Sequence, residues 1–199
     1  MATFYGSYIG YGTSATQAPG YAFQGETKGY NYGGYSHPAA GRTAGYDRTS
    51  FTSDIDAVDV GDMASGNPGR DSWAGCSSAT DGYQCGGYGP GAYSPNTANV
   101  IEKHTFESEG NCVDVGDLAS LECGSHRRDL ATSSAEFYGY PTGGHRAASD
   151  PTCGSQNYGE IQRFQMVASA SGADVGDLGS EMEVVVVIQI LRMLRVILL

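Results

Sequence analysis

A short phrase that recurs three times constrains this chain more than any other feature. Asp-Val-Gly-Asp, followed by Met or Leu, begins at Asp59, Asp114 and Asp174, so the copies start 55 and 60 residues apart. A fixed internal period indicates a repeat architecture before any local pattern is considered. The chain is therefore expected to contain three imperfect copies of one unit of about 55 residues.

The repeated unit extends upstream of the phrase. A base and a phenylalanine precede the first two copies at the same offset, and the third copy keeps only Arg163 and Phe164. Further upstream, a Tyr/Gly block at 27–35 matches 80–88, with a looser version at 137–145. The predicted organisation is a Tyr/Gly-rich segment at 1–26, repeats at 27–65, 80–120 and 137–180, and an apolar segment at 181–199.

The composition favours disorder over a packed core. Gly accounts for 30 of the 199 residues, and Leu, Ile, Val and Phe are scarce before position 184. Ordering a backbone costs about 1–2 kcal/mol per residue, and few apolar side chains are present to offset this cost. The predicted fold class is a mostly disordered, low-complexity chain with three repeats and one C-terminal apolar helix; a folded solenoid is the alternative.

The charge distribution bears on the kind of partner. Residues 51–183 hold twenty acids and six bases, a balance of −14 within a net charge of −11. An acidic chain of this kind is poorly suited to contact a nucleic-acid backbone, which needs Lys and Arg to replace its counterions. The expected partners are proteins and other copies of the chain, with RNA reached only indirectly.

Tyrosine is the second prominent residue type. A tyrosine ring offers an apolar face, a π system and a hydroxyl group, so many rings on a loose chain favour weak, multivalent association. The candidate self-association residues are Tyr30, Tyr32, Tyr35, Tyr83 and Tyr88.

The segments 29–36 and 82–89 resemble the Tyr-rich prion-like regions of nuclear RNA-binding proteins of the FET and heterogeneous nuclear ribonucleoprotein type. The resemblance is compositional and covers about a quarter of the chain. It implies a nuclear location, self-association and a role in transcription or RNA processing. The chain lacks the RNA-recognition domain, zinc knuckle and Arg-Gly-Gly boxes of that family.

The acidic phrase is interpreted as a docking motif. Alternating carboxylates and apolar side chains in a flexible chain suit a partner groove with a basic rim, and three copies would add avidity. Duplication without a selected function is the alternative. The candidate docking residues are Asp59, Val60, Asp62, Met63, Asp114, Val115, Asp117, Leu118, Asp174, Val175, Asp177 and Leu178.

No catalytic, cofactor or metal site is predicted. The two carboxylates of each phrase supply too few oxygen ligands for a calcium loop, and no cleft is evident in which acid–base chemistry could be tuned. The five cysteines, at 76, 85, 112, 123 and 153, form no Cys-x-x-Cys pair, so no zinc site is expected. No secretory segment and no Asn-x-Ser/Thr sequon is evident, so no disulfide framework is expected either.

The last sixteen residues have a different character. Val184 to Leu199 is apolar except for Gln189, Arg192 and Arg195, which share one side of a helix. Such a helix favours self-association or contact with a membrane surface; a short membrane span, an aggregation-prone strand and an alternative end of a longer protein are other interpretations. The candidate contact residues are Leu191, Arg192, Leu194, Arg195 and Leu198.

The sequence therefore predicts a non-enzymatic, multivalent interaction protein, nuclear or cytoplasmic, that acts through tyrosine contacts and acidic docking motifs. One alternative is a membrane-associated adaptor held by residues 184–199. Another is a Gly/Tyr-rich structural matrix protein.

Overall fold

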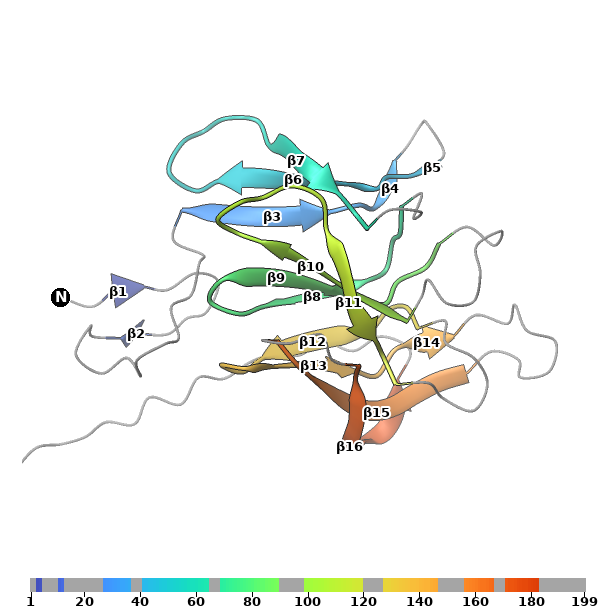
Figure 1. Cartoon of the computed structure of the whole chain (residues 1–199). Coiled ribbons are helices and arrows are strands. Elements are labelled where there is room, and N and C mark those ends of the chain that lie inside the picture. The colour runs from blue at the N-terminus through green and yellow to red at the C-terminus, as the bar shows by residue number, and fades with distance from the viewer. Residues whose placement is uncertain are drawn as a thin grey trace, which may run out of the picture.

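The chain folds into antiparallel sheets. The computed structural model describes residues 3–4, 11–12, 27–36, 41–64, 69–89, 99–119, 127–146, 156–166 and 171–182. Three sheets follow one another in chain order and are stacked from top to bottom in Figure 1. Two short pairs of strands complete the described structure: β1 (Thr3–Phe4) with β2 (Tyr11–Gly12), and β4 (Tyr35–Ser36) with β5 (Gly41–Arg42).

Each of the three sheets is a meander in which most neighbours in sequence are neighbours in the sheet. The first sheet holds β3 (Lys28–Tyr32), β6 (Gly45–Ser50) and β7 (Val58–Asp62). The second holds β8 (Ala74–Ser77), β9 (Asp81–Cys85), β10 (Val100–Thr105) and β11 (Val113–Asp117). The third holds β12 (Ala131–Ser134), β13 (Tyr138–Thr142), β15 (Gln156–Gln165) and β16 (Ala173–Met182), with β14 (His145–Arg146) also paired to β15. A four-stranded antiparallel meander is the unit from which one blade of a β-propeller is made.

The three sheets are built alike. Arg48, Lys103 and Arg163 each pair with the residue just before a recurring phrase, at Val58, Val113 and Ala173. The phrases themselves lie in the outermost strands β7, β11 and β16. Strands β8 and β12 precede the Tyr/Gly blocks, and these two strands contact each other between the second and third sheets.

The Gly-Gly pair of each Tyr/Gly block ends a strand. All six glycines have positive φ angles: 43° and 110° at Gly33 and Gly34, 62° and 110° at Gly86 and Gly87, and 62° and 104° at Gly143 and Gly144. Glycine adopts this backbone region without the steric cost that a side chain imposes. These glycines therefore specify a turn at the same point of each sheet.

Two apolar cores fill the spaces between the sheets. Tyr32, Tyr46, Met63 and Cys112 pack between the first and second sheets. Between the second and third sheets lies a larger cluster that consists of Tyr83, Cys85, Ile101, Leu118, Leu130, Phe164 and Met166. Each buried ion pair joins the segment before a sheet's first strand to its third strand: Arg70 with Glu102 at 2.9 Å and Arg127 with Glu160 at 2.7 Å.

The prediction of a mostly disordered, low-complexity chain with a C-terminal helix is wrong. The described residues form antiparallel sheets and contain no helix. A stacked sheet needs only the apolar side chains between it and its neighbour, and the tyrosines supply much of that area. Residues 183–199, which include the predicted helix and its contact residues Leu191, Arg192, Leu194, Arg195 and Leu198, lie outside the described residues.

Candidate functional site: the acidic rim of the outer strands

The recurring phrase forms the same backbone irregularity in all three outer strands. The first aspartate of each copy accepts a hydrogen bond from the amide of the glycine two residues later, at 3.2 Å for Asp59 and 3.0 Å for Asp114 and Asp174. The strand register shifts beside each of these hydrogen bonds. Bulges of this kind bend a strand and re-aim its side chains. The first aspartate and the glycine thus have a structural role.

The remaining backbone of the phrase joins successive sheets. Gly110 donates its N–H to the carbonyl of Val60 at 3.0 Å, and Cys112 donates to Asp62 at 2.7 Å. At the next junction, Gly172 donates to the carbonyl of Asp117 at 2.6 Å. A Cβ atom on Gly61 would lie 2.5 Å from the carbonyl oxygen of Gly110, so the close approach requires glycine there.

The apolar residue that follows each phrase points inward in the first two sheets. Met63 and Leu118 are buried in the two cores, whereas Leu178 of the third sheet is half-buried. Val60 and Val115 are half-buried, and Val175 is exposed. The structure therefore does not present the apolar and acidic residues of the phrase together on one surface in the first two sheets.

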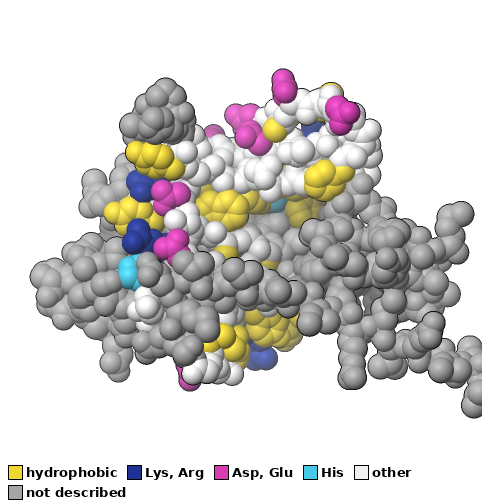
Figure 2. All heavy atoms as spheres, turned by 180° about the vertical axis from the view of Figure 1, so that it is seen from behind, with side chains coloured by type: hydrophobic (Ala, Val, Ile, Leu, Met, Phe, Trp, Pro, Cys, Tyr) yellow, Lys and Arg dark blue, Asp and Glu magenta, His cyan; other side chains and the backbone are white. Residues whose placement is uncertain are grey.

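The carboxylates are the part of the phrase that reaches solvent. Six of them define the surface called here the acidic rim: Asp59, Asp62, Asp114, Asp117, Asp174 and Asp177, all exposed. Within the described part of the chain, the side chains of Asp62, Asp117 and Asp177 make no hydrogen bond or ion pair. Partial burial and the charge of nearby Asp114 raise the pKa of Asp117. In Figure 2, acidic side chains gather over the top of the molecule, where Figure 1 places β6 and β7.

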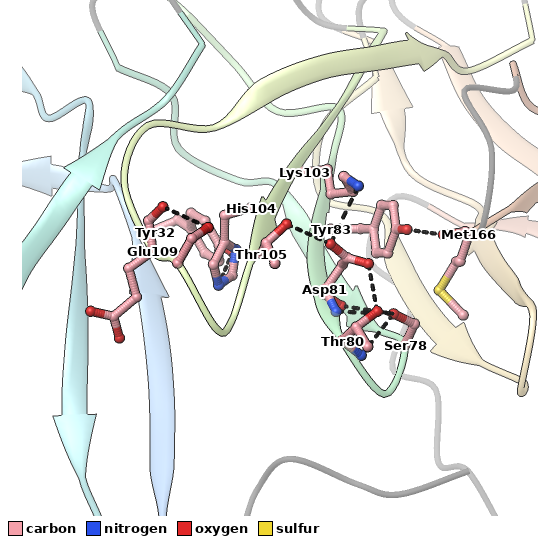
Figure 3. A network of polar contacts seen from close by, with 11 residues as sticks. Tyr32, Ser78, Thr80, Asp81, Tyr83, Lys103, His104, Thr105, Glu109 and Met166 are labelled. Atoms are coloured by element: carbon pink, nitrogen blue, oxygen red, sulfur yellow. Dashed lines mark hydrogen bonds and ion pairs between the residues drawn. The ribbon is translucent and has the colours of Figure 1, made fainter. Parts of the chain in front are cut away.

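The tyrosines predicted to mediate self-association have different surroundings. Tyr32 and Tyr83 are buried, Tyr30 and Tyr88 are half-buried, and Tyr35 is exposed. The Tyr32 hydroxyl group hydrogen-bonds His104, and that of Tyr83 donates to the carbonyl of Met166, as Figure 3 shows. Both contacts join one sheet to the next.

Figure 3 also shows two titratable groups of the second sheet, His104 at the junction with the first sheet and Asp81 within the second sheet. Burial lowers the pKa of His104 to about 4, so the ring is neutral where it packs against the tyrosines of the first sheet. Burial alone would raise the pKa of Asp81, but hydrogen bonds from Thr80 and Thr105 and the charge of Lys103 lower it overall.

A column of alternating rings and ion pairs runs along one side of the stack, from the β4–β5 pair to the start of the third sheet. Figure 2 shows it at the left edge as hydrophobic, basic and acidic side chains that end in a histidine. Arg42 lies 5.8 Å from the ring of Tyr35 and 4.6 Å from that of Tyr88. Arg128 lies 5.0 Å from the same Tyr88 ring. Asp71 pairs with Arg42 at 3.0 Å. Because its charges are paired within the column, this feature fastens the sheets together.

Sequence reasoning missed Arg128 of the column and the buried ion pairs. A signal for the latter was present, because Arg70 and Arg127 are 57 residues apart and Glu102 and Glu160 are 58 apart, close to the repeat period. The described ranges hold no group of three or more His, Cys, Asp or Glu side chains able to bind a metal ion. No helix long and apolar enough to cross a membrane occurs in that same part of the chain.

Comparison with known proteins adds no family to these observations. No protein family model matches the chain, and no curated protein is similar to it.

Proposed function

We propose that this protein is a non-enzymatic, multivalent interaction protein whose acidic rim binds a basic surface of a protein partner. The proposal rests on one observation, the exposure of the second aspartate of each phrase. The backbone of Asp62 and Asp117 joins neighbouring sheets, but the side chains of Asp62, Asp117 and Asp177 are exposed and have no described partner. In the first two sheets the bulge, the junctions and the cores use the other positions of the phrase, which leaves the second aspartate for binding.

Charge supports a cationic partner. Acids exceed bases by 14 over residues 51–183, which contain the rim. Partial burial of Asp117 and the like charge of Asp114 disfavour the charged form of Asp117. A cation beside these two carboxylates stabilises the charged form and so gains binding energy. Equivalent carboxylates on three rigid sheets also allow one partner to be held at several points, which raises the effective concentration at each.

The experiment is a titration with a Lys/Arg-rich peptide, followed by fluorescence anisotropy at low and at physiological salt. The variant Asp62→Asn/Asp117→Asn/Asp177→Asn should bind at least about tenfold more weakly than the native chain, a loss of about 1.4 kcal/mol. Its matched control is Asp47→Asn/Asp56→Asn/Glu107→Gln, which removes the same charge from exposed positions outside the rim.

The control variant should retain most of the affinity. Equal losses in the two triple variants would show that the peptide senses only net charge, and would refute the rim as a binding surface. The nuclear or cytoplasmic location and the indirect association with RNA stay predictions.

A further inference from the structure

The second sheet docks on the first through the segment that lies just before its outer strand. In the second sheet this segment is 106–112. The ring of Phe106 stacks on Tyr30 of the first sheet at 5.3 Å, with an angle of 15° between the rings. Glu109 binds Arg48 at 2.9 Å and accepts a hydrogen bond from the hydroxyl group of Tyr30 at 3.1 Å. Together with the backbone bond from Gly110 to Val60, these contacts cover the face of the first sheet.

The third sheet docks on the second in the same direction. The ring of Phe164, which lies within β15, is 5.5 Å from that of Tyr83, the tyrosine equivalent to Tyr30. Phe164 follows Arg163 as His104 follows Lys103, so this contact corresponds to that of His104 with Tyr30. The amide of Gly172, just before β16, binds the outer strand β11 at Asp117. Gly172 thus makes the same backbone contact as Cys112, so this contact to the preceding outer strand occurs at both junctions.

The first sheet carries the same docking segment, and the described structure places no other sheet against it. A shift of 55 residues places Phe51, Asp54 and Ile55 at the positions of Phe106, Glu109 and Gly110. All residues from 51 to 59 are exposed, with 57% of Phe51 and 60% of Ile55 accessible to solvent. An apolar ring and an aliphatic side chain are therefore exposed where the second sheet buries a contact.

The third sheet carries the complementary surface at the opposite end of the stack. Tyr140 corresponds to Tyr30, and Arg163 to Arg48. Arg163 is exposed and Tyr140 is half-buried. Leu178 is half-buried, although its counterparts Met63 and Leu118 are buried by the following sheet or its docking segment. One end of the stack thus offers an acid and a phenyl ring, and the other offers an arginine and a tyrosine ring.

We propose that copies of this chain associate head to tail, with the docking segment 51–57 of one copy on the third sheet of the next. Phe51 stacks on Tyr140, and Asp54 pairs with Arg163, as Phe106 and Glu109 do on Tyr30 and Arg48 within the chain. A contact between two different surfaces of one protein is heterologous, so it produces a ring if the rotation closes and a filament if it does not. The proposal goes beyond binding at the acidic rim and uses none of the rim side chains.

Sedimentation velocity of the full chain over a micromolar to millimolar concentration series tests this association. The native chain should form larger species as concentration rises. Asp54→Arg and Arg163→Asp should each remain monomeric, because each creates two like charges at the junction. An equimolar mixture of the two variants should associate again, since every junction between unlike chains regains opposite charges. Glu107→Arg, which changes the same charge at another exposed position, should associate like the native chain.

Three results would overturn the proposal. They are a native chain that is monomeric at all concentrations, association that survives both single charge reversals, and a mixture that associates no better than its components. A monomeric native chain whose amides at 51–57 are protected from hydrogen exchange would show that the chain itself covers this segment. Circular dichroism of each variant establishes that the sheets are intact.

Discussion

At the scale of single residues, the polar groups between the sheets have fixed partners and charge states. Glu109 shows this balance: burial alone would raise its pKa, but Arg48, Tyr30 and Lys28 lower it overall. His104 has the opposite outcome, because burial dominates over the carboxylates of Asp81 and Glu109 and the ring stays neutral. Neutral His104 can then hydrogen-bond Tyr32 across the junction.

This charge state predicts a specific pH dependence of stability. The pKa of His104 falls from 6.5 to about 4 on folding, so the unfolded chain binds the proton more tightly. The contribution of neutral His104 to the free energy of unfolding is fully present above pH 6.5, the pKa in the unfolded chain. It is lost as pH falls toward about 4, by roughly 3 kcal/mol in total. Urea unfolding across this range should show the loss.

His104→Gln provides the comparison, because glutamine keeps a hydrogen-bonding group for Tyr32 but does not titrate. Carboxylates with lowered pKa values, such as Asp81, contribute equally to both proteins, so the difference between the two curves isolates the histidine. Parallel curves for the two proteins would contradict a neutral, buried His104.

At the scale of elements, the outer strand is defined by its bulge. The phrase places an aspartate and a glycine in β7 and in β11, with a buried Met or Leu directly after each strand. At Gly61 the second sheet closes over the glycine. A side chain that accepts a hydrogen bond from the amide two residues later needs no long-range contact, so the sequence encodes this geometry locally. The two aspartates of one phrase therefore differ in energetic role.

Substitution in β11 should separate those roles. Asp114→Ala removes the acceptor for the amide of Gly116 and should destabilise the protein by about 1 kcal/mol. Asp117→Ala removes an exposed side chain beside a like charge and should change stability by less than about 0.5 kcal/mol in either direction. Chemical denaturation measures both values. Equal destabilisation by the two substitutions would refute the division between a structural and a free carboxylate.

At the scale of the whole molecule, the three sheets form a linear array in which each contacts its neighbour. Stability in such arrays is a sum of terms within repeats and between adjacent repeats. The junctions here combine aromatic stacking, backbone hydrogen bonds and ion pairs, and the rings of Tyr30, Tyr46 and His104 meet at the first of them. The array is ordered because each junction covers one face of each of the two sheets that it joins.

An ordered array predicts a spectrum unlike that of a disordered chain. The full chain should show wide amide dispersion by NMR and a far-ultraviolet circular dichroism spectrum of strand type. Amides of β9 and β10 should exchange slowest, because these strands lie inside the second sheet and carry buried residues such as Tyr83 and Ile101. Narrow dispersion throughout would contradict the fold.

The sequence by itself determined the period, because copies of one phrase recur along the chain. It also determined the Gly-Gly turns and the bulges, because each of these depends on residues within a few positions of one another. Arg48, Lys103 and Arg163 occupy one register position for that reason. The sequence did not determine whether the chain is ordered, because flexible chains also have compositions rich in Gly and Tyr. Only the tertiary structure decided that Tyr32 and Met63 are buried while Tyr35 and Asp62 are exposed. Burial of a residue in one sheet depends on the neighbouring sheet, which comes from a segment about 55 residues away.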